Sequence, residues 1–319
     1  MATITPAKIK ERIKSAKKVA IFGHLHPDLD CFGAMFGAKY MCESLGVKCD
    51  IFSNFADDLF LLGIFPKSEI KTKFDKSKYD LILIVDCHTF ERIDALYRED
   101  LAGKDILIVD HHKQIFDDKD IEFYIRSDKC SASIVIYDLL KKFKIKLTPE
   151  VATYIYAGIV GDTDRFLHNN TTHEVFDCAS QLVKAGADVQ KVYDVVYRSM
   201  TMSQIHLRNF LFENLTEFSE KVCYVVVSKA DLAKLHATVE DLKMFVNDIN
   251  LIKKYSAVVV AYEVEDNNYK VSMRSKNNAE VLSVAVRHGG GGHKMAAGFS
   301  LAGNKRVVLS EIKKICKEF

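Results

Sequence analysis

The sequence predicts an α/β protein with two domains, the first of them built on a parallel sheet. In the first half of the chain, short apolar, β-branched runs alternate with helical patterns, as in segments 17–24, 80–86 and 105–112. Continuous apolar strands are typical of a parallel sheet that helices cover on both faces. A chain of 319 residues that is 48% hydrophobic is also long enough to bury two cores.

The domain boundaries follow from where this pattern changes. Residues 1–187 are predicted to form the first domain, which ends in two helical patterns. Residues 188–215 contain neither Pro nor Gly and read as one long helix or two, so this segment is the predicted linker. Residues 216–319 then read as a smaller α/β domain, in the order strand, helix, two strands joined near Asp266, helix, glycine-rich loop and amphipathic helix.

Composition limits the partners and the compartment. A formal net charge of +2 does not suggest a long polyanion, so extended duplex nucleic acid is a disfavoured partner. The eight cysteines are scattered without a C-x-x-C pair, which favours a reducing compartment. The chain starts without an apolar core of signal-peptide length, and no run approaches the ~20 apolar residues that span a bilayer. The expected location is the cytoplasm, with no membrane association.

The first cluster of chemically active residues is His24-Leu-His-Pro-Asp28-Leu-Asp30, between a predicted strand and a predicted helix. Hard divalent ions take carboxylate oxygens, and imidazole shifts the preference toward Mn²⁺, Zn²⁺ or Fe²⁺. A mixed site of this kind suits Mn²⁺. The structural alternative is a polar turn in which Asp30 caps the following helix.

Two further clusters follow apolar strands, namely Asp86 and the triplet Asp110-His111-His112. The ends of adjacent parallel strands lie about 5 Å apart, so these side chains can converge with the first cluster. One carboxylate could then bridge two metal ions. The alternative is that these residues only satisfy hydrogen bonds in turns, which is plausible for the neighbouring His88 and weak for the triplet.

A fourth cluster, Gly161-Asp162-Thr163-Asp164-Arg165-Phe166, closes a mostly apolar helical run. Four acidic clusters in one half of a chain are typical of a two-metal hydrolase, whose ions lie about 3.5–4 Å apart. Bound cations would offset the repulsion among these carboxylates. The sequence therefore predicts a site for two divalent metal ions.

A glycine-rich segment lies far downstream, in Arg287-His288-Gly289-Gly-Gly-Gly292-His293-Lys294. Glycine amides can approach an anion closely, so this segment reads as a phosphate or nucleotide cradle. The alternative is a flexible linker. Arg274, in the preceding predicted strand, is suited to bidentate contact with a phosphate.

In this order, the motifs closely resemble the DHH phosphoesterase family, in the branch that carries the DHH-associated C-terminal domain. The matching pieces are HLHPDLD, Asp86, the triplet at 110–112, GDTDRF and GGGGHKMAAG, which together span residues 24 to 298. The length and the compact second domain look most like the NrnA-type branch of oligoribonucleases (nanoRNases) and pAp phosphatases, rather than the longer RecJ-type exonucleases. The resemblance implies an N-terminal parallel-sheet DHH domain and a smaller C-terminal domain.

The resemblance also implies roles for individual residues. Two Mn²⁺ ions, or alternatively Mg²⁺ or Co²⁺, would be bound by His24, Asp28, Asp30, Asp86, His111 and Asp162, with Asp86 as the bridge. His112 would lie by the scissile phosphate and Asp110 would orient a neighbour, so the implied catalytic residues are His112, Asp110 and Asp86. The implied substrate contacts are Arg92, Arg274, Gly291, Gly292 and His293. One departure is Asp164, where the family commonly has Gly; its carboxylate either influences substrate choice or points away.

The expected activity is that of a Mn²⁺-dependent hydrolase of ester bonds, of the 3′-5′ exoribonuclease and pAp phosphatase type. It would cut short oligoribonucleotides to 5′ mononucleotides and dephosphorylate the 3′,5′-bisphosphate nucleotide pAp. The alternative is a phosphodiesterase for the cyclic dinucleotide c-di-AMP or for pApA. A single-strand exonuclease, an inorganic pyrophosphatase and a non-catalytic nucleotide sensor are less favoured, since the GGGGH segment suits a nucleotide and all six candidate ligands are present. The resemblance further suggests a homodimer formed through the first domain.

Overall fold

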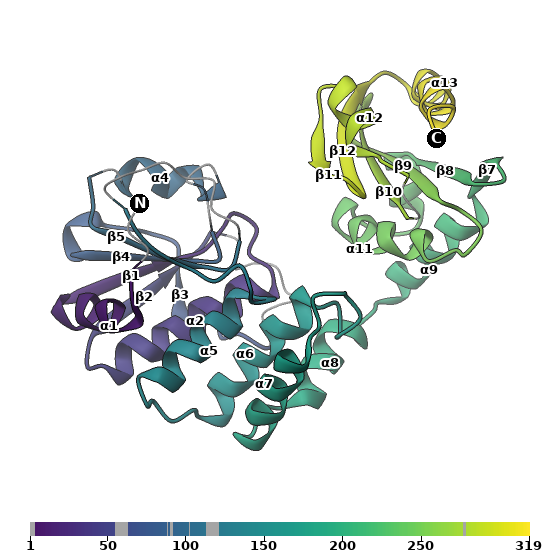
Figure 1. Ribbon diagram of the computed structural model, residues 1–319. Coiled ribbons are helices and arrows are strands. Elements are labelled where there is room, and N and C mark those ends of the chain that lie inside the picture. The colour runs from purple at the N-terminus through teal and green to yellow at the C-terminus, as the bar shows by residue number, and fades with distance from the viewer. Residues whose placement is uncertain are drawn as a thin grey trace. The chain divides into compact units, whose positions relative to one another are not determined.

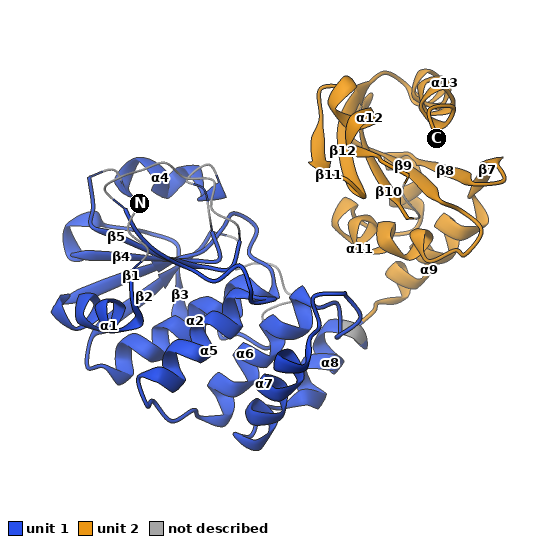
Figure 2. Ribbon diagram, in the orientation of Figure 1, with its two compact units in different colours: residues 1–199 blue, residues 200–319 orange. Residues whose placement is uncertain are grey.

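The computed structural model describes residues 4–54, 63–87, 89, 92–101, 103–112, 121–276 and 279–319, and it leaves the side chains of Tyr197 and His293 outside that description. The chain divides into two compact units, residues 1–199 and residues 200–319 (Figure 2). Each unit has its own sheet and its own helices.

Unit 1 is built on a six-stranded sheet in the order β3-β2-β1-β4-β5-β6, in which every neighbouring pair of strands is parallel (Figure 1). The predicted parallel sheet is therefore confirmed. Its strands are β1 (Lys18–Phe22), β2 (Lys48–Phe52), β3 (Ile70–Lys71), β4 (Leu81–Val85), β5 (Ile106–Asp110) and β6 (Glu122–Ile125). Two short 3₁₀ turns, η1 (Lys67–Glu69) and η2 (Lys76–Lys78), flank β3.

Helices cover both faces of this sheet. On one face, apolar side chains of α1, α2, α5, α6 and α7 form one continuous core with the strands. On the other face, α4 contributes Tyr97 and Leu101 to an aromatic cluster around Phe22 and Phe52. The helices are α1 (Pro6–Ser15), α2 (Leu29–Ser44), α4 (Ala95–Leu101), α5 (Ala132–Lys142), α6 (Pro149–Asp162), α7 (His173–Lys184) and α8 (Val189–Tyr197).

The strand order reverses between β1 and β4, which are neighbours in the sheet. The chain leaves β1 toward α2 on one face of the sheet and leaves β4 toward α4 on the other. The two connections therefore separate at the carboxyl ends of these strands. Open α/β sheets bind their ligands at this kind of position.

Unit 2 contains a second six-stranded sheet, in the order β11-β12-β10-β9-β8-β7. It is mixed: β8 and β9 are parallel and the other pairs are antiparallel. One face packs against α12 and α13, and the other against α9, α10 and α11. The elements are α9 (Met202–Glu213), β7 (Thr216–Ser219), β8 (Val222–Val227), α10 (Lys229–Lys234), α11 (Val239–Asn250), β9 (Ala257–Glu265), β10 (Asn268–Ser275), α12 (Leu282–Arg287), β11 (Gly291–His293), β12 (Ala296–Ala302) and α13 (Lys305–Cys316).

The predicted smaller α/β domain is thus present, with four differences in its order of elements, one of which is the unpredicted strand β12 before the last helix. A hairpin of β7 and β8 replaces the single first strand, and two helices, α10 and α11, replace the single helix after it. The segment predicted to be a glycine-rich loop contains the strand β11, which pairs with β12. Backbone pairing made this segment a strand although glycine has a low preference for strands.

Residues 188–215, the predicted linker, contain two helices, α8 and α9. α8 packs against α6 of unit 1, whereas α9 packs against α11 of unit 2. Each helix thus has its packing partner in a different unit. Among the described residues, every helix falls short of the length and apolar character needed to cross a membrane.

Candidate metal centre and substrate-binding residues

The loop between β1 and α2 and the first turn of α2 hold the first three candidate ligands, His24, Asp28 and Asp30. Asp28 Oδ1 accepts hydrogen bonds from the backbone amides of Asp30 and Cys31, both at 3.0 Å, so Asp28 is the N-cap of α2. The expected alternative, in which Asp30 caps this helix, is wrong because Asp30 already lies in the first helical turn. The cap orients the loop so that His24 Nε2 lies 3.8 Å from Asp28 Oδ2.

Asp30 is fully buried and is held by the start of α5. Its Oδ2 accepts from the amide of Ala132 at 2.6 Å, and its Oδ1 accepts from the amide of Ser133 at 2.9 Å. The N-terminus of a helix favours negative charge, so α5 supports this carboxylate. Even so, burial and then the charge of Asp86 raise the pKa of Asp30 to about 7.

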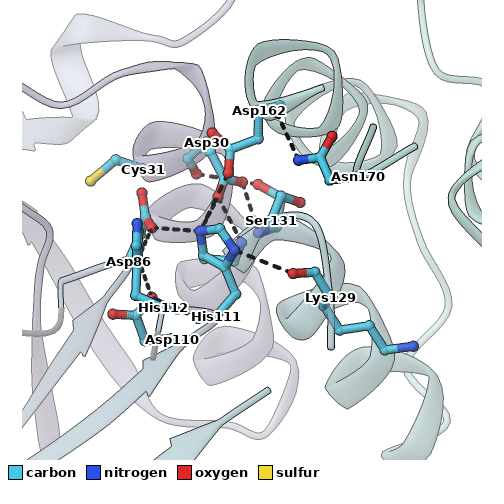
Figure 3. Close-up of polar contacts among 12 residues, drawn as sticks. Asp30, Cys31, Asp86, Asp110, His111, His112, Lys129, Ser131, Asp162 and Asn170 are labelled. Atoms are coloured by element: carbon cyan, nitrogen blue, oxygen red, sulfur yellow. Dashed lines mark hydrogen bonds and ion pairs between the residues drawn. The ribbon is translucent and has the colours of Figure 1, made fainter. Parts of the chain in front are cut away.

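Asp86 directly follows β4 and lies beside His111 (Figure 3), and His24 is near its other oxygen. Its Oδ2 is 3.5 Å from Nε2 of His24, and its Oδ1 is 3.5 Å from Nε2 of His111. Asp86 also has φ of 51°, in the left-handed region that costs a non-glycine residue roughly 1–2 kcal/mol. The fold therefore holds a strained backbone at a carboxylate that faces both histidines.

His111 forms a second group with two further carboxylates. Its Nε2 lies 3.3 Å from Asp162 Oδ2 and 3.9 Å from Asp30 Oδ2 (Figure 3). Asp162 is the last residue of α6, which approaches α2 closely because Gly33 and Gly158 face each other: a Cβ at Gly33 would lie 3.3 Å from Gly158 Cα. Glycines in the two helices thus bring Asp162 to the end of the sheet.

Hydrogen bonds to the backbone indicate which nitrogen of each histidine carries the proton. His24 Nδ1 lies 2.8 Å from the carbonyl of Leu25, and His111 Nδ1 lies 3.4 Å from the carbonyl of Lys129. A carbonyl only accepts, so in each ring Nδ1 donates. The lone pair of each neutral imidazole is then on Nε2, which faces the carboxylates and is suited to a cation.

The environment of this cluster fits a divalent cation. Asp86 Oδ1 and His111 Nε2 are buried and have no hydrogen-bond partner in the described part of the chain, although only 3.5 Å separates them. Burial and then the charges of Asp30, Asp28 and Asp86 raise the pKa of Asp162 to about 9. Buried polar atoms without a partner are costly, and a cation bound among them would remove that cost.

The same cluster keeps both histidines positively charged when no cation is bound. Burial alone would lower the pKa of His24, but Asp28 and Asp86 raise it to about 10. Burial likewise opposes the charge of His111, but Asp86 and Asp30 raise its pKa to about 10. Protons thus occupy the positions that metal ions would take.

His112 and Asp110 form a pair beside Asp86. Asp110 is fully buried, and its Oδ1 accepts from Nδ1 of His112 at 2.9 Å. Burial opposes ionisation, but the bond to His112 holds the pKa of Asp110 below its ordinary value. His112 is about one third exposed and lies 3.5 Å from Asp86 Oδ1, so it borders the cluster on the solvent side.

Asp164 does not join the cluster. Its Oδ1 lies 2.9 Å from Nη2 of Arg165, and both side chains are about 40% exposed. Asp164, Arg165 and Phe166 all have positive φ, which gives a physical reason for glycine to be common at position 164 in the family. The extra carboxylate therefore pairs with its neighbour, in keeping with the interpretation that it points away.

The expected substrate contact Arg92 lies on an exposed turn near the first cluster. Its carbonyl accepts a hydrogen bond from the amide of Leu25 at 2.5 Å, so the backbone of Arg92 anchors the loop that carries His24. The side chain of Arg92 forms no ion pair within the described ranges, which omit residues 90 and 91.

In unit 2 the sheet brings the remaining candidates together. Arg274 on β10 pairs with Ala296 on β12, and Ala296 pairs with His293 on β11, so the three residues form one row across the sheet. Neighbouring strands lie about 4.8 Å apart, which places the backbones of Arg274 and His293 roughly 10 Å from each other. The side chain of His293 is not described.

The adjacent glycines have different reasons to lack a side chain. A Cβ at Gly290 would lie 2.1 Å from the carbonyl oxygen of Gly298, and one at Gly292 would lie 2.5 Å from that of Ala296. A Cβ at Gly291 would meet no atom of the described residues within 4 Å. Packing therefore explains two of these glycines, and the open space above Gly291 suits close approach of a ligand.

The sequence did not reveal the backbone groups that hold the candidate ligands by hydrogen bonds. These are the amides of Ala132 and Ser133, which hold Asp30, and the carbonyl of Lys129, which holds the His111 ring. One signal was available: Ser131 caps α5, and a serine before an apolar run marks a helix start. The pairing of that helix start with Asp30 depends on tertiary structure.

Together, the fold and the cluster define an α/β protein with a candidate divalent-cation centre at the carboxyl ends of a parallel sheet. The DHH family, N-terminal domain, matches residues 18–159, and the DHHA1 domain matches residues 219–318. The chain belongs to the DHH family, as the motifs indicated.

Several named proteins are similar in sequence to nearly the whole of this chain. The chain is 29% identical to the Mycoplasma pneumoniae protein named bifunctional oligoribonuclease and PAP phosphatase NrnA, over 95% of this chain and 93% of the relative. It is 27% identical to the Bacillus subtilis protein of the same name, over 94% and 95%. A cyclic-di-AMP phosphodiesterase, GdpP of Geobacillus thermodenitrificans, is 26% identical over 94% of this chain but only 47% of its own length.

Solved structures agree with the fold. A crystal structure of an exopolyphosphatase-related protein from Bacteroides fragilis superposes with a TM-score of 0.89 at 21% identity, over 98% of this chain and 95% of that one. RecJ of Thermus thermophilus, in complex with Mn²⁺, gives a TM-score of 0.53 at 14% identity, over 98% of this chain and 54% of that one. At these identities the likeness concerns the fold alone.

Proposed function

We propose that this protein hydrolyses short oligoribonucleotides to 5′ mononucleotides and dephosphorylates pAp. The observation that carries the proposal is the position of Asp86, whose two oxygens face His24 and His111, each at 3.5 Å. A carboxylate shared by two sets of ligands is the arrangement that a pair of divalent ions requires.

The ligands divide into two sets that share Asp86. His24 and Asp28 would hold one ion with it, and Asp30, His111 and Asp162 would hold the other. When bound, such ions activate water and neutralise charge on a phosphate. The protein contributes the orientation of the ligands: the bonds from Nδ1 to the backbone keep both Nε2 atoms turned toward the carboxylates.

His112 is the proposed group for proton transfer at the reacting phosphate. Its Nδ1 is engaged by Asp110, so Nε2 is the nitrogen that exchanges a proton with substrate. Asp110 stabilises the protonated ring and holds its orientation. A partly exposed His112 beside buried ligands also suits a residue that meets substrate from the solvent side.

Unit 2 supplies the proposed contacts to the nucleotide. A phosphate or base would lie on the row formed by Arg274, Ala296 and His293, with the open face of Gly291 allowing close approach to the backbone. Arg92 is proposed as a further contact from unit 1. An inorganic pyrophosphatase would have no use for a site that holds a base.

The relatives support this choice of substrates, because two of them that match nearly the full length are named for oligoribonuclease and pAp phosphatase activity. A second candidate is hydrolysis of c-di-AMP or its linear product pApA, supported by the likeness to GdpP. The relatives named NrnA match this chain from end to end, whereas GdpP is about twice as long, so the first activity is preferred.

The donor set and the cysteines support two finer proposals, on the metal and on the compartment. Mixed carboxylate and imidazole ligands suit Mn²⁺ better than Mg²⁺, so Mn²⁺ is the proposed metal. All eight cysteines are buried free thiols, in keeping with a reducing cytoplasm. By resemblance to the family, the protein is also proposed to form a homodimer. A measurement of its molar mass in solution would test this.

The proposal is tested by turnover of pAp, pApA, a short RNA and c-di-AMP by purified protein with Mn²⁺. Asp86→Ala serves as the control, since it removes the shared carboxylate. Release of mononucleotides from RNA and of phosphate from pAp, both abolished in Asp86→Ala, is the expected result. Preference for c-di-AMP would favour the second candidate, and no turnover of any substrate would contradict hydrolysis of nucleotides.

A further inference from the structure

The surroundings of Arg274 differ from those of a structural arginine. Its guanidinium is half-buried on β10, where Nε donates to Oδ1 of Asn247 at 2.7 Å and Nη1 donates to the carbonyl of Met273 at 3.0 Å. Both acceptors are neutral. Among the described residues, Arg274 has no carboxylate within ion-pair distance. The side chain is therefore held in place while its charge is left uncompensated.

Neighbouring arginines of unit 2 show the contrast. Arg208 on α9 forms an ion pair with Asp248 at 2.7 Å, and Arg287 forms one with Glu318. Asp248 is the residue next to Asn247 on α11. One helix thus presents a carboxylate to one arginine and, one residue earlier, a neutral amide to another. The difference matters because a carboxylate neutralises a guanidinium, whereas an amide only orients it.

We propose that Asn247 is a positioning residue that orients Arg274 for an anionic group of the substrate without neutralising its charge. This inference rests on the proposed function. It assigns the anion to a phosphate of the nucleotide, since phosphate is the anionic group that pAp and short RNA share.

The hydrogen-bond inventory of the guanidinium supports this assignment. An arginine has five N–H donors in a rigid plane, and two of them are used by Asn247 and Met273. Three donors remain, both on Nη2 and one on Nη1. Paired donors on one edge match the two oxygens of a phosphate. Because Nε must donate, Asn247 has to present its oxygen, so its amide orientation is determined.

The competing explanation is that the hydrogen bond of Asn247 to Arg274 only stabilises the packing of α11 on β10. The near-isosteric variant Asn247→Asp separates the two roles. This variant keeps an acceptor for Nε, so the hydrogen bond between α11 and β10 is preserved. Its carboxylate, however, forms an ion pair with Arg274 and neutralises the charge of the guanidinium. A structural role predicts normal activity for this variant, whereas the positioning role predicts weaker substrate binding.

The experiment compares KM and kcat for pAp with Mn²⁺ in wild type, Asn247→Asp, Arg274→Ala and the double variant. Asp248→Asn is the matched control, because it changes the adjacent acceptor, which faces Arg208. We expect KM to rise roughly tenfold in Asn247→Asp and in Arg274→Ala, with kcat and the melting temperature little changed. The double variant should be no worse than Arg274→Ala, and Asp248→Asn should match wild type in KM.

Three results would overturn the inference: a normal KM in Asn247→Asp, a normal KM in Arg274→Ala, or effects that multiply in the double variant. Failure of the proposed function would look different, as absence of turnover in wild type. In that event, calorimetric titration of wild type and Asn247→Asp with pAp in the presence of Mn²⁺ compares their Kd values for pAp. Wild-type binding that Asn247→Asp weakens would support the inference, and binding that is absent or equal in both would contradict it.

Discussion

Oδ1 of Asp110 lies 2.9 Å from Nδ1 of His112 and also accepts the backbone amides of His111 at 2.6 Å and of His112 at 3.1 Å. One buried oxygen thus fixes both the ring of His112 and the turn that carries His111. A histidine whose Nδ1 donates to a carboxylate presents Nε2 to substrate and is stabilised when protonated. The triplet at 110–112 therefore joins the candidate metal centre to the candidate proton donor.

Asp110→Asn should lower kcat by about 100-fold or more while KM and metal stoichiometry change little. An asparagine at this position would keep its oxygen toward Nδ1 and the two backbone amides, but a neutral amide no longer stabilises the protonated ring of His112, which weakens proton transfer without removing a metal ligand. Steady-state kinetics with pAp and a Mn²⁺ titration check the two halves of this prediction. Wild-type kcat in Asp110→Asn would show that Asp110 does not act through His112.

The stability of the metal-free chain should fall as pH rises from about 4 to about 9. The pKa of Asp30 is raised from 3.8 to about 7 and that of Asp162 from 3.8 to about 9, so the folded metal-free chain binds more protons than the unfolded chain in this range. Stability falls with pH wherever the folded state binds more protons. The pKa values of His24 and His111, raised from 6.5 to about 10, act in the same direction at higher pH.

Melting temperatures between pH 5 and pH 9, measured with EDTA and with excess Mn²⁺, test this account. Bound cations replace the protons, so the stabilisation by Mn²⁺ should grow as pH rises, and Mn²⁺ binding near pH 7 should release protons. A metal-free chain whose melting temperature rises steadily over this range, or a Mn²⁺ effect independent of pH, would contradict the assignment of these groups to a cation site.

Gly291→Ala should fold normally and bind substrate poorly. In the described part of the chain nothing lies within 4 Å of the added Cβ, so the melting temperature should stay close to that of wild type. KM for pAp should rise because the methyl group occupies the space left for a ligand. Gly290→Ala is the contrasting variant. Its Cβ would lie 2.1 Å from the Gly298 carbonyl oxygen, so this variant should have a lower melting temperature than wild type. A normal KM in Gly291→Ala would remove this glycine from the substrate site.

The convergence of strand-end residues was predictable from sequence. His24, Asp86 and Asp110 each follow an apolar strand, and parallel strands end at one edge of the sheet, so their proximity requires only the correct strand order. Asp162 was predicted from its motif, but its position depends on how α2 and α6 pack. That packing relies on contact between Gly33 and Gly158, which spacing along the chain does not reveal.

Other features depended on contacts between distant residues. The glycine-rich segment was expected to be a loop, yet Gly291–His293 pairs with β12, and close backbone contact explains Gly290 and Gly292 better than flexibility does. The bond between Asn247 and Arg274 joins residues 27 positions apart on a helix and a strand. No local pattern identifies such a partner, because asparagine near the end of a helix is unremarkable by itself.

The number of Mn²⁺ ions bound per chain, measured by equilibrium dialysis on wild type and Asp86→Asn, tests the central claim most directly. Asp86 lies between His24 and His111, so the account predicts two ions in wild type and a large loss of affinity at both sites in Asp86→Asn. His24→Ala should weaken one site and spare the other. Fewer than two ions in wild type, or two tightly bound ions in Asp86→Asn, would contradict a centre built around this shared carboxylate.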